Sequence, residues 1–265
     1  ASLYLSFTNY GGLTAPKFVG FDNYVQMFTR DRLFFGSIGR TFYYALSIVP
    51  LGLVSSFVVA VLLNQNIHFK SIYRTLFFMP SLTPIVALTI LWLWILQPQF
   101  GLVNYLLRQI GIDGPAWFGS TKWAVPSLIF MGLWNSVGGG RMLIFLAALQ
   151  GVPNELYEAA TIDGANAFQK FLHVTLPMVS PALLFNLILG VIGAFKVFQT
   201  AFIATYGGPA RATWFFALHI YFNAFRFLKM GYACALAWIF FLIVLALTIL
   251  QFYLSEKWVY YAGSQ

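Results

Sequence analysis

The stretch GVPNELYEAATIDGANAFQKFLHVTLPMVSP, residues 151–181, is a polar island in a very apolar chain. Pro153 suits a first helical position, and the acidic residues after it interact favourably with the positive end of a helix dipole. Gly164 suits the left-handed end of that helix, and Asn166 suits the cap of a second one. Pro177 and Pro181 are predicted to mark the exit. The stretch therefore predicts a helix–glycine–helix hairpin between two hydrophobic spans.

A fixed spacing within this stretch carries a family resemblance. Glu158-Ala159-Ala160, then Gly164, then Val174-Thr175-Leu176-Pro177 resembles the EAA motif of bacterial ABC importer membrane subunits, with Val174 in place of the usual Ile. In that family the loop is cytoplasmic and docks into a cleft on an ATPase subunit. The resemblance implies a docking role for Glu155, Glu158, Ala159, Ala160, Asp163 and Gly164.

Composition independently indicates a membrane protein. Hydrophobic residues make up 60% of the chain and charged residues 8%, whereas a soluble domain is about half apolar and a quarter charged. The single Cys234 excludes an intramolecular disulfide, and the three histidines have no metal-ligand spacing. No nucleotide-binding or nucleophile motif is present. We therefore expect no enzyme activity, metal or cofactor in this chain, and any ATP and Mg must be bound by a partner ATPase.

The predicted fold is all-α, a polytopic transmembrane helix bundle forming one domain, 1–265, with a cytoplasmic docking loop at 151–177. Residues 1–8 are predicted to be the remnant of a further span at the N-terminus. An amphipathic turn is expected around Tyr105 to Ile110, and an interfacial helix at 212–227. Segments long and apolar enough to cross about 30 Å of hydrocarbon give five complete spans: 41–63, 75–96, 123–149, 178–205 and 231–254, with a loop at Asn64 to Arg74.

The orientation implied by the motif conflicts with the distribution of positive charge. A cytoplasmic motif loop places four cations inside and nine outside, the reverse of the positive-inside rule. We keep the orientation of the motif because its spacing is specific. The expected inner cations are Lys70, Arg74, Lys170 and Lys257, and the outer ones are Lys17, Arg30, Arg32, Arg40, Arg108, Lys122, Arg211, Arg226 and Lys229.

Two further cations, Arg141 and Lys196, are predicted inside spans. At the helical rise, Arg141 lies roughly 14 Å from Gln150 and Lys196 roughly 15 Å from Tyr206, so both are expected near mid-membrane. A charge there is costly unless it faces protein, water or a counter-charge, and the spans contain no acidic residue. One interpretation pairs each cation with a partner subunit or helix-end carbonyls. A second has both line the translocation path and attract an anionic solute. A third has them snorkel to an interface, although neither is near a helix end.

The resemblance is strongest to the carbohydrate-importer branch, the relatives of the larger membrane subunit of the maltose transporter. It covers nearly the whole chain, including Thr205-Tyr206-Gly207-Gly208-Pro209, which is similar to the family's T-x-G-G-P ending. Matching the motif and the paired prolines, Pro80 and Pro84, places the family's sugar-contacting positions on the helices around the loop. With nearby polar and charged groups, the predicted substrate path comprises Ser81, Asn135, Ser136, Arg141, Ala194, Lys196, Val197 and Gln199.

The sequence thus predicts the membrane subunit of an ATP-driven carbohydrate importer in a bacterial inner membrane, and we hypothesise an acidic oligosaccharide as its solute. The resemblance implies a second homologous permease, two ATPase subunits and an extracytoplasmic solute-binding protein as partners, with membrane lipid but no nucleic acid. Alternatives are an importer for a phosphodiester or amino acid, an ion-driven secondary transporter, or a non-transporting membrane scaffold. The secondary transporter should show intramembrane Asp or Glu, which the spans lack.

Overall fold

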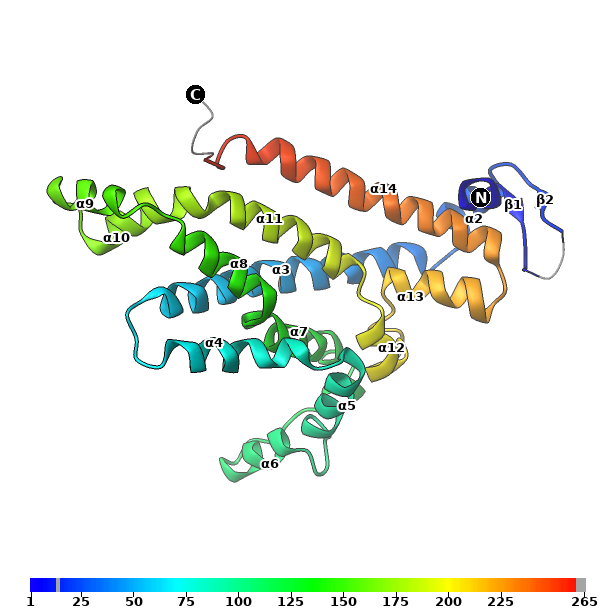
Figure 1. Cartoon of the computed structure of the whole chain (residues 1–265). Coiled ribbons are helices and arrows are strands. Elements are labelled where there is room, and N and C mark those ends of the chain that lie inside the picture. Colours follow the sequence, from blue (N-terminus) through cyan, green and yellow to red (C-terminus); the bar gives the residue numbers. More distant parts are fainter. Residues whose placement is uncertain (13–14, 261–265) are drawn as a thin grey trace. The chain divides into compact units, whose positions relative to one another are not determined.

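The computed structural model describes residues 1–12 and 15–260, which divide into two compact units that we treat separately. Unit 1 comprises Ala1–Ser47, Ile85–Met131 and Ile192–Leu247, and unit 2 comprises Ile48–Pro84, Gly132–Val191 and the residues from Thr248 on. Long helices supply residues to both units (Figure 1): α3 (Phe34–Asn64), α7 (Ala124–Val137), α11 (Leu176–Phe195) and α14 (Met230–Ser255).

Unit 1 packs its core where α2, α3, α13 and α14 meet. Met27, Phe34, Phe216 and Leu236 are almost fully buried there, and Phe34 and Phe216 pack edge to face with ring centroids 5.7 Å apart. The remaining elements of this unit are α1 (Ser2–Ser6), β1 (Thr8–Asn9), β2 (Lys17–Phe18), α2 (Asp22–Thr29), α5 (Ile85–Ile95), α6 (Leu102–Gln109), η2 (Trp117–Gly119), α12 (Gln199–Thr205), α13 (Phe216–Tyr221) and the π-helical turn η4 (Phe222–Arg226).

Unit 2 packs its core between α3, α8 and the start of α11. Ala60 on α3, Met142 and Phe145 on α8 and Val179 on α11 are fully buried. The remaining elements of this unit are α4 (Lys70–Phe78), η1 (Met79–Leu82), α8 (Gly139–Gln150), α9 (Asn154–Ile162), α10 (Ala167–Lys170) and the π-helical turn η3 (Phe171–Thr175).

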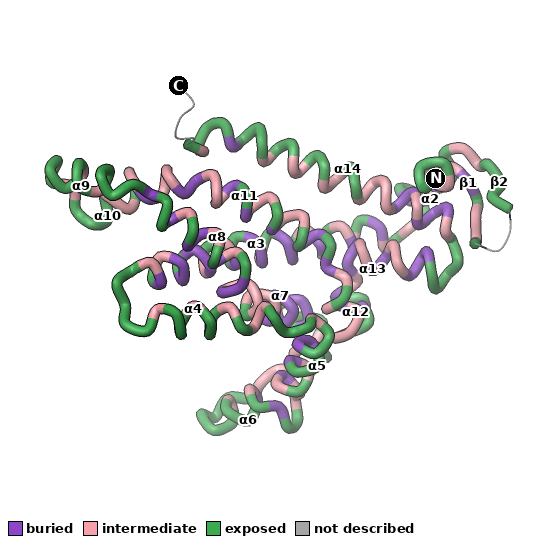
Figure 2. The backbone as a smooth tube through the Cα atoms, in the orientation of Figure 1, coloured by how far each residue is buried: buried purple, intermediate pink, exposed green. Residues whose placement is uncertain are grey.

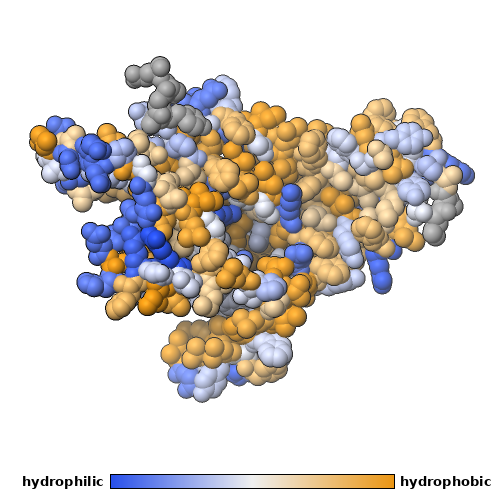
Figure 3. All heavy atoms as spheres, viewed as in Figure 1, coloured by the Kyte–Doolittle hydropathy of each residue, from blue (hydrophilic) through white to orange (hydrophobic). Residues whose placement is uncertain are grey.

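Apolar side chains also cover much of the surface, as expected of helices that contact lipid. Much of α14 is exposed (Figure 2), although its residues are almost all apolar. In Figure 3 hydrophilic residues gather in unit 2 around α9 and around the link between α3 and α4. Three continuous helices are long and apolar enough to cross a membrane: Phe34–Asn64, Ala167–Phe195 and Met230–Ser255. Counting each of two bent helix pairs as one span raises the number to five.

The predicted span 75–96 is broken. Helix α4 already begins at Lys70, inside the predicted loop, and helical structure stops at Thr83 before α5 begins at Ile85. Thr83 is extended, with ψ 128°, because a residue that precedes proline is sterically excluded from the helical region. Pro84 therefore ends the first helix instead of lying within one span.

The predicted start of the next span at residue 178 is also wrong, because one helix runs from Ala167 through the prolines to Phe195. Pro181 removes the N–H that would reach the carbonyl of Pro177. The Ser180 hydroxyl donates to that carbonyl instead, at 2.6 Å. Pro177 follows a π-helical turn, Phe171–Thr175, which is wider than an α-helical turn. This wider turn accommodates the Pro177 ring. The prolines are thus accommodated, and they do not mark an exit.

The same span ends ten residues earlier than predicted. Helix α11 stops at Phe195, and α12 begins only at Gln199, so Lys196 lies in the break between two helices. A cation just beyond a helix C-terminus interacts favourably with the negative end of the helix dipole. Lys196 is exposed within the chain.

Smaller features agree in part with the sequence analysis. The expected amphipathic turn is α6, the expected helix at 212–227 covers Phe216–Arg226, and the proposed N-terminal remnant coincides with the five-residue α1. The fold is not purely α-helical, because β1 and β2 pair antiparallel with Thr8 opposite Phe18. The predicted span 123–149 is interrupted at Gly138-Gly139-Gly140-Arg141, where α7 and α8 meet at a bend of 42°.

Candidate functional site

The polar island folds as the predicted helix–glycine–helix hairpin of α9 and α10. Gly164 adopts φ +78°, and no atom lies within 4 Å of a Cβ built there, so backbone conformation alone demands glycine at this position. The amide of Ala165 donates to the carbonyl of Ala160 at 2.9 Å, which closes the end of α9. Pro153 lies one residue before the first helical position that was predicted for it.

Helix α10 is fixed by a complete capping box. The Asn166 side chain accepts from the Gln169 amide at 2.9 Å, and the Gln169 side chain accepts from the Asn166 amide at 2.8 Å. Such reciprocal bonds satisfy two donors that a helix start leaves unpaired. The role predicted for Asn166 as a cap is therefore confirmed.

Two hydrogen bonds hold α9 against the continuous helix Ala167–Phe195, which comprises α10, η3 and α11. The hydroxyls of Tyr157 and Thr175 lie 2.9 Å apart, and Lys170 Nζ donates to Thr161 Oγ1 at 2.7 Å. The hairpin is thus tied to a long helix, and a force on the hairpin is transmitted to that helix through defined contacts.

The predicted docking residues lie on the open side of this hairpin. Glu155, Glu158, Ala159, Asp163 and Gly164 are exposed, and Ala160 is half-buried. The sequence analysis missed two apolar neighbours: Ile162 is 87% exposed and Phe168 is 71% exposed. Their position on either side of Gly164, in an otherwise polar stretch, could have identified them from the sequence. Large apolar side chains so exposed beside carboxylates indicate a surface that another protein covers.

Arg141, one of the two predicted intramembrane cations, lies in a slot made by glycines of unit 2. A Cβ added to Gly52 would lie 2.9 Å from Arg141 Nη1 and 2.9 Å from Ser136 Oγ. A Cβ added to Gly190 would lie 3.1 Å from Arg141 Nη2. Glycine on α3 and on α11 therefore makes room for the guanidinium, which packs between helices.

The other predicted path residues of unit 2 surround the bend between α7 and α8. A Cβ added to Gly139 would lie 3.2 Å from Ser81 Cβ, and a Cβ added to Gly138 would overlap the carbonyl oxygen of Phe77. Asn135 has a buried amide oxygen for which the described residues supply no hydrogen-bond partner. An apolar cavity of about 470 Å³ opens beside this bend, lined by Tyr73, Leu76, Phe77, Pro80, Trp134, Val137 and Gly138.

Lys196 belongs to a separate cavity in unit 1. This cavity of about 400 Å³ is lined by residues around the break between α11 and α12 and by Tyr44 and Ile85. Lys196, Val197 and Gln199 from the predicted path all line it, whereas Ala194 is buried beside it. The structure therefore brings the predicted path residues together in two groups: Lys196, Val197 and Gln199 in unit 1, and Ser81, Asn135, Ser136 and Arg141 in unit 2.

Comparisons with known proteins show the family of this chain. Residues 48–260 match the family described as "Binding-protein-dependent transport system inner membrane component". The chain is 41% identical to the probable ABC transporter permease protein YesP of Bacillus subtilis, over 100% of this chain and 86% of that protein. It is 32% identical to the sulfoquinovosyl glycerol transport system permease protein SmoG of Agrobacterium fabrum, over 89% of this chain and 76% of that protein.

A solved structure shares the fold. One chain of a bacterial ABC transporter involved in the import of the acidic polysaccharide alginate superposes with a TM-score of 0.83. The match covers 91% of this chain and 84% of that chain, at 23% sequence identity. With the family match over most of its length, this chain belongs to the inner membrane components of binding-protein-dependent ABC transport systems.

Proposed function

We propose that this chain forms part of the translocation path of an ATP-driven carbohydrate importer in a bacterial cytoplasmic membrane. The observation that carries the proposal is the hairpin of α9 and α10, which exposes Glu155, Glu158, Ile162 and Phe168 beside a glycine-dependent turn. In the proposed complex this hairpin inserts into an ATPase subunit, and the hydrogen bonds of α9 to the continuous helix Ala167–Phe195 transmit ATP-driven movement to the spans. The two bent helix pairs then count as spans, which gives five complete spans plus the N-terminal remnant.

The remaining partners in this proposal are a second, homologous permease, two ATPase subunits that bind ATP and Mg, and an extracytoplasmic solute-binding protein. A path shared by two permeases suits the broken helices, since backbone groups freed at a break can face a polar path inside a membrane. The breaks at Thr83-Pro84, Gly138 and Lys196 supply such groups in this chain.

The solute we propose is an acidic saccharide. Lys196 is exposed in a cavity beside Gln199, so one carboxylate of a solute could meet an ammonium while neighbouring hydroxyls meet an amide. Arg141 contributes a second cation in unit 2. The names of the relatives include both an anionic sugar conjugate, sulfoquinovosyl glycerol, and the acidic polysaccharide alginate. One relative, 30% identical, is named for starch degradation products, so the family also serves neutral sugars.

A transport assay of Lys196→Met and Arg141→Met tests the solute. The reconstituted importer is given acidic and neutral sugars of equal length, in competition. We expect the preference for the acidic sugar to fall about tenfold in Lys196→Met, the order expected for losing one charge-assisted hydrogen bond. The matched control is Lys122→Met, which removes an exposed cation outside the cavity and should leave the preference unchanged.

Two results would contradict this assignment. Equal preference in the parent and both variants would remove the anionic solute from the proposal. Failure of Arg141→Met to assemble, with normal selectivity in Lys196→Met, would assign both cations to helix packing and partner contacts.

A second solute class has a specific observation in its favour. The chain is 32% identical to the sn-glycerol-3-phosphate transport system permease protein UgpA of Yersinia pestis, over 93% of this chain. The negative charge of a phosphate ester would also be attracted to a cation that lines the path, such as Lys196. Adding sn-glycerol 3-phosphate and a glycerophosphodiester to the competition separates this class from acidic sugars.

A further inference from the structure

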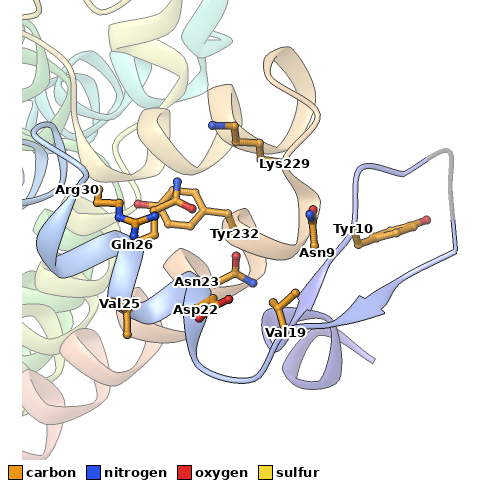
Figure 4. Close-up of a pocket in the computed structure, with 10 residues that line it drawn as sticks. All are labelled: Asn9, Tyr10, Val19, Asp22, Asn23, Val25, Gln26, Arg30, Lys229 and Tyr232. Carbon is orange, nitrogen blue, oxygen red and sulfur yellow. The ribbon is translucent and has the colours of Figure 1, made fainter.

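A polar cavity of about 360 Å³ lies in unit 1. It opens between the β1–β2 segment, α2 and the start of α14, and Figure 4 shows side chains from all three around it. The main-chain amide of Gly231 donates to the carbonyl of Tyr10 at 3.0 Å, which joins two of these walls. The lining residues are Asn9, Tyr10, Val19, Asp22, Asn23, Val25, Gln26, Arg30, Lys229 and Tyr232.

Buried hydrogen bonds hold one wall of this cavity in place through Asn23. This side chain is only 7% exposed, and its amide nitrogen donates to the carbonyls of Ser6 at 2.8 Å and Thr8 at 2.9 Å. Both amide protons are therefore used, and the amide oxygen remains as the group that Asn23 offers to the cavity.

A buried network holds the opposite wall through Tyr232. The Tyr232 hydroxyl donates to Asp31 Oδ2 at 2.6 Å, and His219 Nε2 lies 2.8 Å from the same oxygen. Trp214 Nε1 donates to His219 Nδ1 at 3.1 Å, so the proton of the neutral imidazole is on Nε2 and points at Asp31. Tyr232 is thus fixed by a network that needs no ligand, as expected of a preorganised site.

The rim of the cavity, in contrast, carries charges that the described chain leaves without ion pairs. Arg30, Lys229 and Asp22 are exposed, and none of them forms a salt bridge with another described residue. Two cations and one carboxylate give the rim a net charge of +1. Such a rim favours a ligand with one negative charge.

We propose that this cavity binds a carboxylate-bearing sugar unit, such as a uronic acid. The carboxylate would lie between Arg30 and Lys229. The ring hydroxyls would meet the amides of Asn9 and Gln26, and one would donate to the amide oxygen of Asn23, whose two amide protons are already used. Amides suit hydroxyls because both groups donate and accept. Tyr10 supplies a ring face for the apolar side of a sugar. A simple inorganic anion would use the two cations and leave these amides without a partner.

This inference rests on the proposed function. The proposed solute is an acidic saccharide, and the proposed topology places this cavity on the outer side of the membrane, where that solute arrives. The site would hold the end of a long saccharide while the remainder enters the path. It is distinct from the path cavity at Lys196, with which it shares no lining residue.

The test is equilibrium binding to the assembled importer in lipid nanodiscs, without the solute-binding protein. The probe is D-galacturonate, with D-galactose as the neutral control. We expect Arg30→Gln and Lys229→Gln each to weaken galacturonate binding about tenfold. The matched controls are Arg32→Gln and Arg226→Gln, which remove exposed cations two and three positions away that do not line the cavity. Both should bind as the parent does, and so should Lys196→Met.

Several outcomes overturn the proposal. In the first, galactose binds as tightly as galacturonate. In the second, equimolar inorganic phosphate displaces galacturonate. In the third, binding is lost when phosphatidylglycerol replaces phosphatidylcholine in the nanodisc. Weakening in Lys196→Met but not in Lys229→Gln would show that the path alone binds the probe. Acidic-sugar transport with no such binding would reject this site and retain the proposed function, whereas binding without transport would do the reverse.

Discussion

At the scale of single residues, His219 and Asp31 form a hydrogen bond between segments 188 positions apart. Burial and the nearby Arg211 lower the pKa of His219, and they outweigh Asp31, which raises it. Burial raises the pKa of Asp31, but hydrogen bonds from Tyr232 and Leu33 and the proximity of His219 outweigh it, so this pKa is lowered. The folded protein therefore favours a neutral imidazole beside a charged carboxylate.

These pKa shifts predict loss of stability as the pH falls. Below the ordinary histidine value of 6.5 the unfolded chain takes up a proton at position 219 that the folded chain does not. Stability should therefore fall below about pH 6.5, and fall again below the ordinary aspartate value of 3.8. We expect His219→Gln to flatten the melting temperature between pH 7 and pH 5, whereas His68→Gln, at an exposed position, should not.

A melting temperature of the parent protein that is constant from pH 7 to pH 5 would contradict the pKa direction given for His219. A slope that survives in His219→Gln would assign the effect to another group.

At the scale of elements, the hairpin of α9 and α10 was predictable because its signals are local. A positive φ at Gly164 and a cap at Asn166 depend on residues within a few positions, and both were confirmed. The limits of α11 were not predictable. Pro181 is tolerated because Ser180 satisfies the carbonyl that proline leaves open, and the helix stops at Phe195 within a stretch, 178–205, whose single charged residue is Lys196.

The hairpin also yields a prediction about coupling. A non-glycine residue at φ +78° is strained by roughly 1–2 kcal/mol, so Gly164→Val should distort the turn while the spans stay folded. We expect substrate-stimulated ATP hydrolysis of the reconstituted complex to fall in Gly164→Val and in Ile162→Asp. Gly20→Val provides a control at another positive-φ glycine, in unit 1. Unchanged stimulation in both hairpin variants would remove the docking role from this loop.

At the scale of the whole molecule, composition was enough to identify a membrane protein and the motif was enough to identify the family. The number of spans was not, because broken helices depend on how neighbours satisfy the freed backbone groups. The candidate sites divide in the same way. The hairpin proposed for docking could be predicted from sequence, whereas the cavity beside Arg30 depends on Lys229 and Tyr232 meeting α2 from the far end of the chain.

The topology gives a direct test of orientation. With Cys234 replaced by alanine, His68→Cys should react with an impermeant thiol reagent only in inverted vesicles, and Asp113→Cys only in intact spheroplasts. Both positions are exposed links outside the candidate spans. The reverse pattern would mean that the positive-inside rule holds and that the orientation taken from the motif is wrong.

The contact between Gly138 and the carbonyl oxygen of Phe77 limits which variants of this protein can exist. A Cβ at position 138 would overlap a backbone atom that no side-chain rotation can move, whereas nothing lies within 4 Å of a Cβ at Gly140. In a library randomised at both codons and selected for growth on the transported solute, codon 138 should return glycine alone. Codon 140 should return several small residues, because α8 there has open space.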